Sequence, residues 1–380
     1  MEPPINRLID DLLKLVFWKV PLIDLIRAKA VCRRWKCLVD NKHFRVGFAN
    51  SHTYCPLAFM KNDFGNHVWL GYDSTSSKWK RMPAFGDIVK KVDPLRTRGS
   101  WKGMLCLKSG NHYSSYTMFN PVIGESKPLP KSSDYWGASE LQMVVEEETK
   151  NLKIVAIGGQ VTEVYNFASN SWTTVALTPK SITNLMICKL KAKNGAAYSN
   201  GFLYCVGQSQ EGFYILVSFN VATEKWSDDV IESPYPTSNA NEVECQVVEC
   251  GGKIFAITET KVGLVEIWMF DCNTQRFSWV MEMPERMCTE VLNIEPGVHQ
   301  ELPKPGNIQC TANSQQIFIW QNHRQTIAAF HLLERKWEIL PSIRRSDYTR
   351  SCPDVDTVEV DAAFFEPTFF ELTVDVAGNS

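Results

Sequence analysis

One stretch of sequence decides the fold of the N-terminal part of this chain. It reads Leu8-Ile-Asp-Asp-Leu-Leu-Lys-Leu-Val-Phe-Trp-Lys-Val-Pro21-Leu-Ile-Asp-Leu-Ile-Arg-Ala-Lys-Ala-Val-Cys-Arg-Arg-Trp-Lys-Cys-Leu-Val-Asp40. Its apolar residues recur at helical spacing, first as Leu8, Leu12, Val16 and Val20. Pro21 ends this run, because proline removes an amide donor and clashes with the preceding turn. A second helical run follows with Leu22, Leu25, Ile26, Val31, Cys32, Trp35 and Leu38. The pattern predicts a small module of about three helices.

This helical module carries more large apolar side chains than three short helices can cover among themselves. A domain of about forty residues buries too little surface to be stable without help. The surplus apolar face is therefore expected to contact either a separate partner or the rest of the same chain. Composition favours neither alternative over the other.

The helical module resembles an F-box. The family's order is Leu-Pro, two acidic residues, Leu-Leu, a branched pair, Leu-Pro, a later leucine, Val-Cys, two basic residues, Trp and Leu. The matching positions are Leu8, Asp10, Asp11, Leu12, Leu13, Val16, Phe17, Val20, Pro21, Leu25, Val31, Cys32, Arg33, Arg34, Trp35 and Leu38. One position departs from the pattern, because the family's first proline is Ile9 here.

The resemblance implies that the module docks on a Skp-type adaptor and, through it, on a cullin-RING ubiquitin ligase. The residues that it implies for the adaptor contact are Leu8, Ile9, Leu12, Leu13, Val16, Pro21, Leu25, Val31, Cys32 and Trp35. Some of them must form the internal core of the module, and the sequence does not separate the two groups.

A repeated unit follows from residue 68 onward. An aromatic residue precedes Asp, Asn or His, and six positions after the polar residue stands a second aromatic residue, usually Trp. The instances are Tyr72-Asp73 with Trp79, Tyr165-Asn166 with Trp172, Phe219-Asn220 with Trp226, Phe270-Asp271 with Phe277, Phe330-His331 with Trp337, and a degenerate Phe119-Asn120 with Ser126. A strand-rich unit that recurs about every 50 residues indicates a propeller.

Each unit contains the features of antiparallel strands. The Asp or Asn opens a turn by bonding its own backbone, and Leu-Pro or Met-Pro ends the following strand. A hairpin half precedes most units, at 103–107, 153–159, 201–207, 251–257 and 316–320. The units resemble kelch repeats. We therefore predict an all-α F-box module followed by an all-β, six-bladed, kelch-like β-propeller, whose closure removes exposed sheet edges.

The predicted domain boundaries are 1–45 for the F-box, 46–373 for the propeller and 374–380 for a tail. Apolar residues alternate near the C-terminus, at Val358, Val360, Ala362 and Phe364. This alternation predicts that 356–373 pairs with the first blade and closes the ring. Since no low-complexity linker follows residue 45, the two modules are expected to pack closely.

Composition limits the classes of partner. The formal net charge of −2 argues against nucleic-acid binding. Residues 1–50 carry 10 Lys and Arg against 5 Asp and Glu, so the helical module should favour an acidic partner surface. The first residues lack a basic start with an apolar core, and the apolar runs contain charges. We expect a cytoplasmic or nuclear protein that is neither secreted nor bound to a membrane.

The sequence offers no constellation for catalysis. The seven histidines show no two-His spacing with a nearby acid that would indicate a metal site. Gly158-Gly159 and Gly251-Gly252 are not phosphate loops, since neither is followed by Lys-Ser or by the start of a helix. The twelve cysteines include no Cys-X-X-Cys pair and are expected to be buried small hydrophobic residues. We predict no catalytic residue, metal or cofactor.

A client protein is expected to bind the propeller loops, because loops carry function and vary in length. The longest are 84–99, 131–140, 284–306 and 341–352. Their Trp, Tyr, His and Arg residues are candidate anchors, namely Arg96, Arg98, Tyr135, Trp136, Arg286, His299, Arg344, Arg345, Tyr348 and Arg350. For any one of them, ordinary surface is the simpler interpretation.

By resemblance, the chain is expected to be the non-catalytic substrate receptor of an SCF-type ubiquitin ligase, acting on an unidentified protein. The alternatives are an interaction scaffold without a ligase role and a propeller receptor for a small molecule or hormone. The runs 119–125 and 364–367 resemble land-plant members of the F-box and kelch family.

Overall fold

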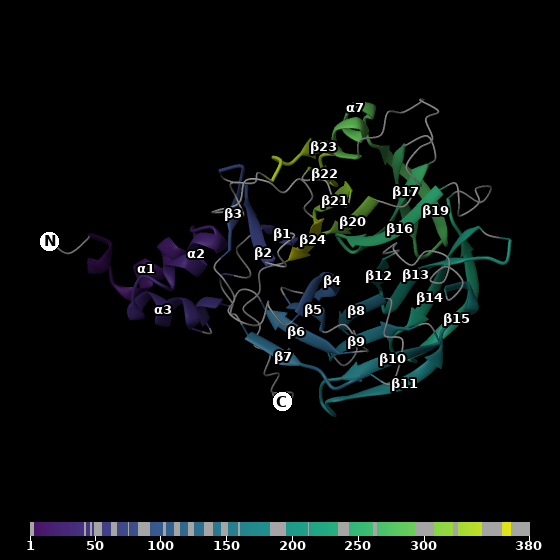
Figure 1. The fold of residues 1–380 in the computed structure, drawn as a ribbon, viewed down its shortest axis with the longest axis horizontal. Helices are drawn as coiled ribbons and strands as arrows, with labels where there is room; N and C mark the ends of the chain where they lie inside the picture. Colours follow the sequence, from purple (N-terminus) through teal and green to yellow (C-terminus); the bar gives the residue numbers. More distant parts are fainter. Residues whose placement is uncertain are drawn as a thin grey trace.

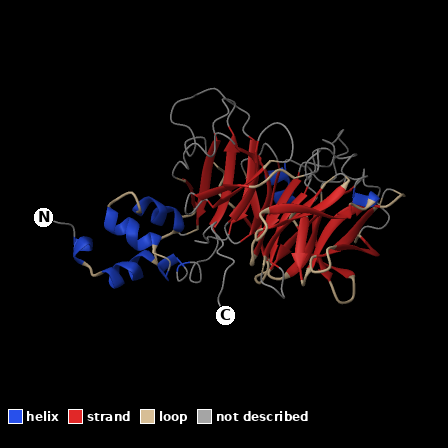
Figure 2. Cartoon of the chain, turned by 90° about the horizontal axis from the view of Figure 1, so that it is seen from below, coloured by secondary structure: helices blue, strands red, loops and turns tan. Residues whose placement is uncertain are grey.

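The computed structural model of the chain describes residues 4–41, 43–45, 48, 55–61, 67–74, 76–82, 92–101, 104–109, 115–120, 125–132, 140–145, 151–158, 160–182, 195–211, 213–234, 243–260, 264–292, 308–321, 326–343 and 359–365. Helices occupy the N-terminal part, and strands dominate the remainder (Figure 1). The N-terminal helices lie at one side of the strands, as Figure 2 also shows.

Within residues 4–41, the helical module contains a 3-10 turn, η1 (Pro4–Arg7), and three helices, α1 (Asp10–Phe17), α2 (Leu22–Ala28) and α3 (Arg33–Asp40). Residues 43–45 and 48 are helical as well. Pro21 stands just outside α2 as its N-cap, where the missing amide hydrogen costs nothing. Cys32 caps α3, because its Sγ accepts a hydrogen bond from the Trp35 amide at 3.5 Å. The second apolar run is therefore divided between α2 and α3, and the prediction of three helices is confirmed.

A single apolar cluster joins the helical module to the strands. Leu13, Phe17 and Leu25 are buried in this cluster, and the ring centroids of Phe17 and Trp35 lie 5.0 Å apart, edge to face. The cluster also contains three buried residues from the strand region, Met82, Leu105 and Phe119. The rest of the chain thus covers part of the surplus apolar surface, and the two modules pack closely.

The described strands form six four-stranded antiparallel sheets. Five sheets each use one continuous stretch of chain: β4 (Val92–Trp101), β5 (Met104–Ser109), β6 (Tyr116–Asn120) and β7 (Glu125–Pro128); β8 (Glu140–Val145), β9 (Leu152–Ile157), β10 (Val161–Asn166) and β11 (Ser171–Leu177); β12 (Ala196–Ser199), β13 (Phe202–Gln208), β14 (Tyr214–Asn220) and β15 (Lys225–Glu232); β16 (Val243–Cys250), β17 (Lys253–Thr260), β18 (Val265–Asp271) and β19 (Arg276–Glu282); β20 (Ile308–Ala312), β21 (Gln316–Gln321), β22 (Ile327–His331) and β23 (Lys336–Ile339). The remaining sheet has the order β24 (Glu359–Phe365), β1 (Cys55–Lys61), β2 (His67–Asp73) and β3 (Lys78–Arg81).

The sheets follow one another around a ring (Figure 1). The innermost strands contact each other in the order β4, β8, β12, β16, β20 and β24, and β24 contacts β4 again. The segment 356–373, predicted to close the ring, is described over Glu359–Phe365, where β24 pairs with β1 from Cys55↔Phe365 to Lys61↔Glu359. The predicted order of a helical module followed by an all-β propeller is confirmed. The boundaries 1–45, 46–373 and 374–380 stay predictions.

In several repeats the Asp or Asn side chain shapes the turn between the third and fourth strands of the sheet. Asn220 Oδ1 accepts hydrogen bonds from the amides of Ala222 and Thr223, at 3.0 and 2.9 Å, and Asn166 makes the same pair of bonds. Four positions after the polar residue, the backbone is left-handed, with φ between 50° and 56° at Ser77, Asn170, Glu224, Gln275 and Arg335. The repeat therefore encodes one turn geometry.

The two aromatic residues of each repeat face each other across this hairpin. Tyr165 is directly opposite Trp172, and their ring centroids lie 5.3 Å apart. The indole of Trp172 also donates a hydrogen bond, at 2.9 Å, to the carbonyl of Pro130, two residues after the last strand of the preceding sheet. The other repeat tryptophans donate in the same direction: Trp79 to Pro341, Trp226 to Thr162, and Trp337 to Glu282. The Trp of the repeat thus links neighbouring sheets, which explains its fixed spacing.

The left-handed turn position predicts opposite effects for two neighbouring substitutions. Gln275→Gly should stabilise the protein by roughly 0.5–1 kcal/mol, because glycine adopts φ of 52° without steric cost. Thr274→Gly is the matched control. It should destabilise the protein, because it removes the hydrogen bond from the Thr274 hydroxyl to Asp271 at 2.9 Å. Urea unfolding followed by tryptophan fluorescence measures both. A lower midpoint for Gln275→Gly than for the unsubstituted chain contradicts the turn assignment.

Candidate functional site

The helical module presents an exposed apolar surface. Nine large apolar side chains stand exposed among the described residues, and five belong to this module. They are Ile9 (65% exposed), Leu12, Leu15, Val16 and Val31 (63% exposed). We call Ile9, Leu12, Leu15 and Val16 the α1 strip. A concentration of exposed apolar side chains on a small module is typical of a protein-binding surface.

Both faces of α1 are apolar. Ile9, Leu12 and Val16 are three and four positions apart, so they lie on one face of the helix. Leu13 and Phe17, which each follow a residue of that face and so lie on the adjacent side of the helix, are buried in the cluster shared with the strands. The internal core therefore uses only one face of α1, and the α1 strip stays available to a partner.

The start of α1 follows the path that a proline would impose. Ile9 is the N-cap residue, with φ of −66° and ψ of 156°, and proline fixes φ near −65°. The carbonyl of Ile9 accepts the first helical hydrogen bond from the Leu13 amide, at 3.0 Å. Replacing the family's proline by Ile9 thus leaves the backbone geometry of this position unchanged.

Arg34 fixes the start of α3 against the start of α1. Its Nε donates a hydrogen bond to Asp10 Oδ1 at 2.9 Å, and its Nη2 donates to the carbonyl of Leu8. The exposed residues Val31 and Cys32 immediately precede α3. The start of the α1 strip, at Ile9, and this second exposed pair are therefore held near each other.

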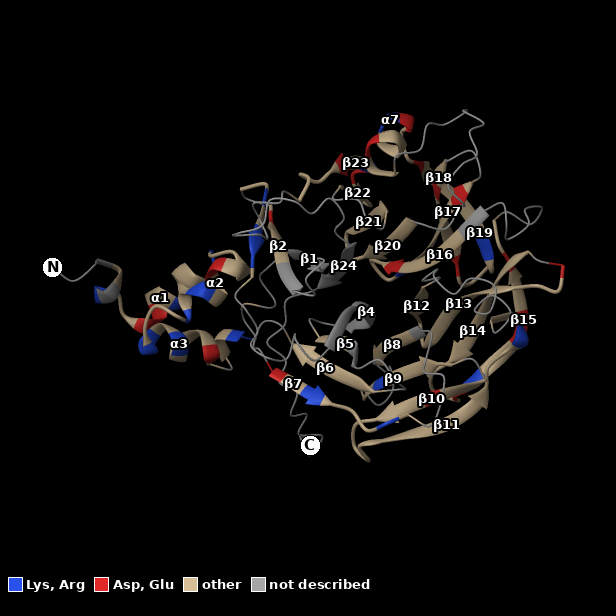
Figure 3. Ribbon diagram, viewed as in Figure 1, with Lys and Arg blue, Asp and Glu red and all other residues tan. Residues whose placement is uncertain are grey.

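A half-buried ionic cluster fixes the far end of α3. Asp40 Oδ1 lies 2.7 Å from Lys29 Nζ and 2.9 Å from Arg45 Nη2. Burial tends to raise the pKa of Asp40, but hydrogen bonds from Lys29 and Arg45 outweigh it and hold this pKa below its usual value. A lowered carboxyl pKa stabilises the fold at neutral pH, and this contribution is lost as the pH falls through the folded-state value. Figure 3 shows the other charged residues on the three helices.

The structure sorts the ten residues predicted for the adaptor contact. Ile9, Leu12, Val16, Val31 and Cys32 are exposed. Leu13 and Leu25 are fully buried and belong to the internal core. Leu8 and Trp35 are partly buried against that core, and Pro21 is partly buried at the N-cap of α2. The F-box pattern missed Leu15, which is exposed beside Leu12 and Val16; its place in the helical period was the available signal.

The residues predicted for client binding are not brought together within the described part of the chain. Arg96 and Arg98 lie in β4, the innermost strand of its sheet, so the prediction of a loop over 84–99 is wrong from residue 92 onward. The strand begins at Val92 because its pairing with β5 continues to Val92↔Ser109, across two register irregularities. Arg286 is exposed in a short helix, α7 (Glu285–Met287), which a π-helix (η2, Cys288–Leu292) follows. Seven candidates lie outside the described residues: Tyr135, Trp136, His299, Arg344, Arg345, Tyr348 and Arg350.

The described residues contain neither a metal-binding cluster nor a helix that could span a membrane. No group of three or more His, Cys, Asp or Glu side chains is arranged to hold a metal ion there. Nor is any helix of that part of the chain long and apolar enough to cross a membrane.

Comparison with known families agrees with this architecture. A model of the F-box domain matches residues 5–47, and a model described as the F-box associated beta propeller domain matches residues 101–352. The chain belongs to this family of F-box proteins. The family that matches its strands is not the kelch family, so the kelch type of repeat is not confirmed.

Relatives of this F-box protein carry the same domain in their names. F-box only protein 6 of Arabidopsis thaliana is 24% identical over 343 residues, which are 87% of this chain and 68% of the relative. F-box only protein 13 of the same plant is 23% identical over 82% of this chain and 74% of its own length. A chain of a solved nidogen/laminin complex aligns over 75% of this chain and 93% of its own length, at 9% identity and with a TM-score of 0.46.

The backbone at Ile9 predicts the effect of restoring the proline. Ile9→Pro should raise the free energy of unfolding by roughly 0.4–1 kcal/mol, because proline restricts the unfolded chain and fits the native φ. Lys14→Pro, inside α1, is the control and should destabilise the protein by about 3 kcal/mol or more. Chemical unfolding of the two variants measures both effects. If Ile9→Pro unfolds at a lower urea concentration than the unsubstituted chain, the α1 start is not the one described.

Proposed function

We propose that this F-box protein is the substrate-recognition subunit of an SCF-type ubiquitin ligase. The observation that carries the proposal is the α1 strip, an exposed apolar face on a helix whose other face is buried. In this proposal the strip binds a Skp-type adaptor, through which a cullin-RING ligase is recruited. The protein itself makes and breaks no bond. It raises the effective concentration of a client lysine near the ubiquitin-charged enzyme.

The shape of the strip supports a helix-in-groove mode of binding. Apolar anchors three and four positions apart are read by a hydrophobic groove on a partner. Val31 and Cys32 extend the apolar surface beyond α1, at the end of the module that Arg34 holds together. The excess of basic residues in 1–50 would speed association with an acidic adaptor surface.

The proposal gives the propeller the task of binding the client. It takes the six four-stranded sheets as six blades that present loops on a rigid ring. Arg286, exposed in α7, is the one candidate anchor whose side chain is described. The other proposed loop anchors are Tyr135, Trp136, His299, Arg344, Arg345, Tyr348 and Arg350. Arg96 and Arg98 also remain proposed anchors, but on the strand β4. A kelch-like repeat and a cytoplasmic or nuclear location also belong to the proposal.

A binding titration with a purified Skp-type adaptor tests the proposed contact. Leu12→Asp places a charge in the centre of the α1 strip and should weaken adaptor binding by at least about tenfold, since central apolar anchors dominate interface energies. Leu177→Asp is the matched control, because Leu177 is 79% exposed at the end of β11 in the propeller. It should leave the affinity within about twofold of the unsubstituted chain.

Circular dichroism and thermal unfolding establish that both variants are folded. Equal adaptor affinity for Leu12→Asp and Leu177→Asp contradicts the proposed contact. If the unsubstituted chain does not bind the adaptor, the protein acts as a scaffold outside the ligase, and the α1 strip serves another partner.

A further inference from the structure

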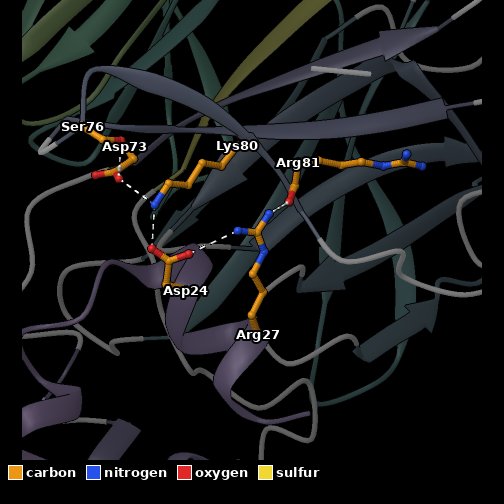
Figure 4. A network of polar contacts seen from close by, with 6 residues as sticks. All are labelled: Asp24, Arg27, Asp73, Ser76, Lys80 and Arg81. Atoms are coloured by element: carbon orange, nitrogen blue, oxygen red, sulfur yellow. Dashed lines mark hydrogen bonds and ion pairs between the residues drawn. The ribbon is translucent and has the colours of Figure 1, made fainter. Parts of the chain in front are cut away.

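The contact between the F-box and the sheet β24-β1-β2-β3 contains a charged network that the adaptor contact does not use. Figure 4 shows its members, Asp24 and Arg27 from α2 and Asp73, Ser76, Lys80 and Arg81 from the strand region. Lys80 Nζ lies 2.6 Å from Asp24 Oδ2 and 2.8 Å from Asp73 Oδ2. One lysine of β3 thus bridges a carboxylate of the helical module and a carboxylate of the propeller.

Burial makes Lys80 the important member of this network. The Asp73 side chain is only 3% exposed and that of Lys80 is 25% exposed. Ser76 Oγ also donates a hydrogen bond to Asp73 Oδ2, at 2.7 Å. Hydrogen bonds to Asp24 and then to Asp73 raise the pKa of Lys80, so its charge persists well above neutral pH. Removing the cation would leave a buried carboxylate facing a second carboxylate, which is strongly destabilising.

A second polar contact lies beside the first. Arg27 Nη2 donates a hydrogen bond to the backbone carbonyl of Arg81 at 2.8 Å, and Arg27 Nη1 lies 3.3 Å from Asp24 Oδ1. The next residue, Met82, is buried in the apolar cluster that contains Leu13 and Phe17 of α1. The end of β3 therefore presents charged, backbone and apolar contacts to the helical module within three consecutive residues.

The position of this network in the ring gives it a larger role. Asp73 is the polar turn residue of the first repeat, and it ends β2. β2 belongs to the sheet in which the chain's two ends meet through the pairing of β1 with β24. The helical module is thus attached to the blade that closes the ring.

We propose that Lys80 is a positioning residue that locks the F-box to the closing blade, so that α2 and the strands β2 and β3 open as one unit. In a ligase receptor this lock would set the distance between the adaptor and a bound client. That consequence rests on the function proposed above, whereas the lock itself does not.

Amide hydrogen exchange of the full chain, measured without any adaptor, tests the lock. Lys80→Met keeps the aliphatic stem and removes the charge. It should speed exchange in both α2 and β2–β3 by at least about tenfold, because local opening no longer breaks the two ion pairs.

Lys153→Met is the matched control. Lys153 Nζ lies 3.0 Å from Glu224 Oε1 and links two neighbouring sheets away from the helical module. In the Lys153→Met variant, the amide exchange rates of α2 should equal those of the unsubstituted chain.

Asp24→Asn separates the two halves of the network, because it leaves the pair between Lys80 and Asp73 in place. Asp24→Asn should speed amide exchange in α2 and leave the exchange rates of β2–β3 unchanged. If Lys80→Met does not fold, Asp24→Asn tests the lock in its place. The proposal is overturned if Lys80→Met changes amide exchange in α2 no more than Lys153→Met does. If Lys80→Met does not fold, the same outcome for Asp24→Asn overturns it. Since no adaptor is present, this outcome is independent of whether the protein binds one.

Discussion

The pairing of β1 with β24 is the constraint on which the rest of the structure depends. It joins the beginning and the end of the strand region in one sheet and brings β24 against β4, which completes the ring. Closure removes the sheet edges that an open row of blades would expose. The pairing joins residues far apart in the sequence, so it costs the chain conformational entropy. Contacts made by the other sheets must offset this cost before the pairing is stable.

The F-box is supported by the end of this closing sheet and by the next sheet in the ring, β4-β5-β6-β7. Three helices of seven or eight residues cannot enclose a core of their own. Met82 and Phe119 of the strand region complete the cluster around Phe17, and Lys80 adds a charged bridge next to it. Because only one side of α1 is used in this packing, the apolar side chains of the α1 strip stay exposed. The module therefore has enough buried side chains to pack on the strands, although five of its large apolar residues are exposed.

The parts of the structure that depend on local sequence could be predicted. Pro21 divided the helices, and the aromatic pair with its turn residue located the hairpins, because these signals act within a few residues. The α1 strip could be located but not sorted, since Leu12 and Leu13 look alike in a pattern and differ only in packing.

Contacts between distant residues could not be predicted. No local signal connects Lys80 to Asp24, or Gln246 to Ile308, whose carbonyl accepts a hydrogen bond from the Gln246 side chain at 2.7 Å between β16 and β20. Arg96 and Arg98 were assigned to a loop because proline and charged residues obscure the start of β4. The client-binding residues could not be identified from the sequence for a related reason. Several loops that are distant in the sequence form a recognition surface together, so its residues show no period along the chain.

The central claim is that the outward face of α1 is the surface that a Skp-type adaptor covers. Hydroxyl-radical footprinting of the full chain, with and without the purified adaptor, measures this cover side chain by side chain. The account predicts protection of Ile9, Leu12, Leu15 and Val16, with unchanged labelling of the exposed propeller residues Leu177 and Trp279. Unchanged labelling of the α1 strip in a sample where the adaptor is bound, or protection confined to the propeller, would contradict it.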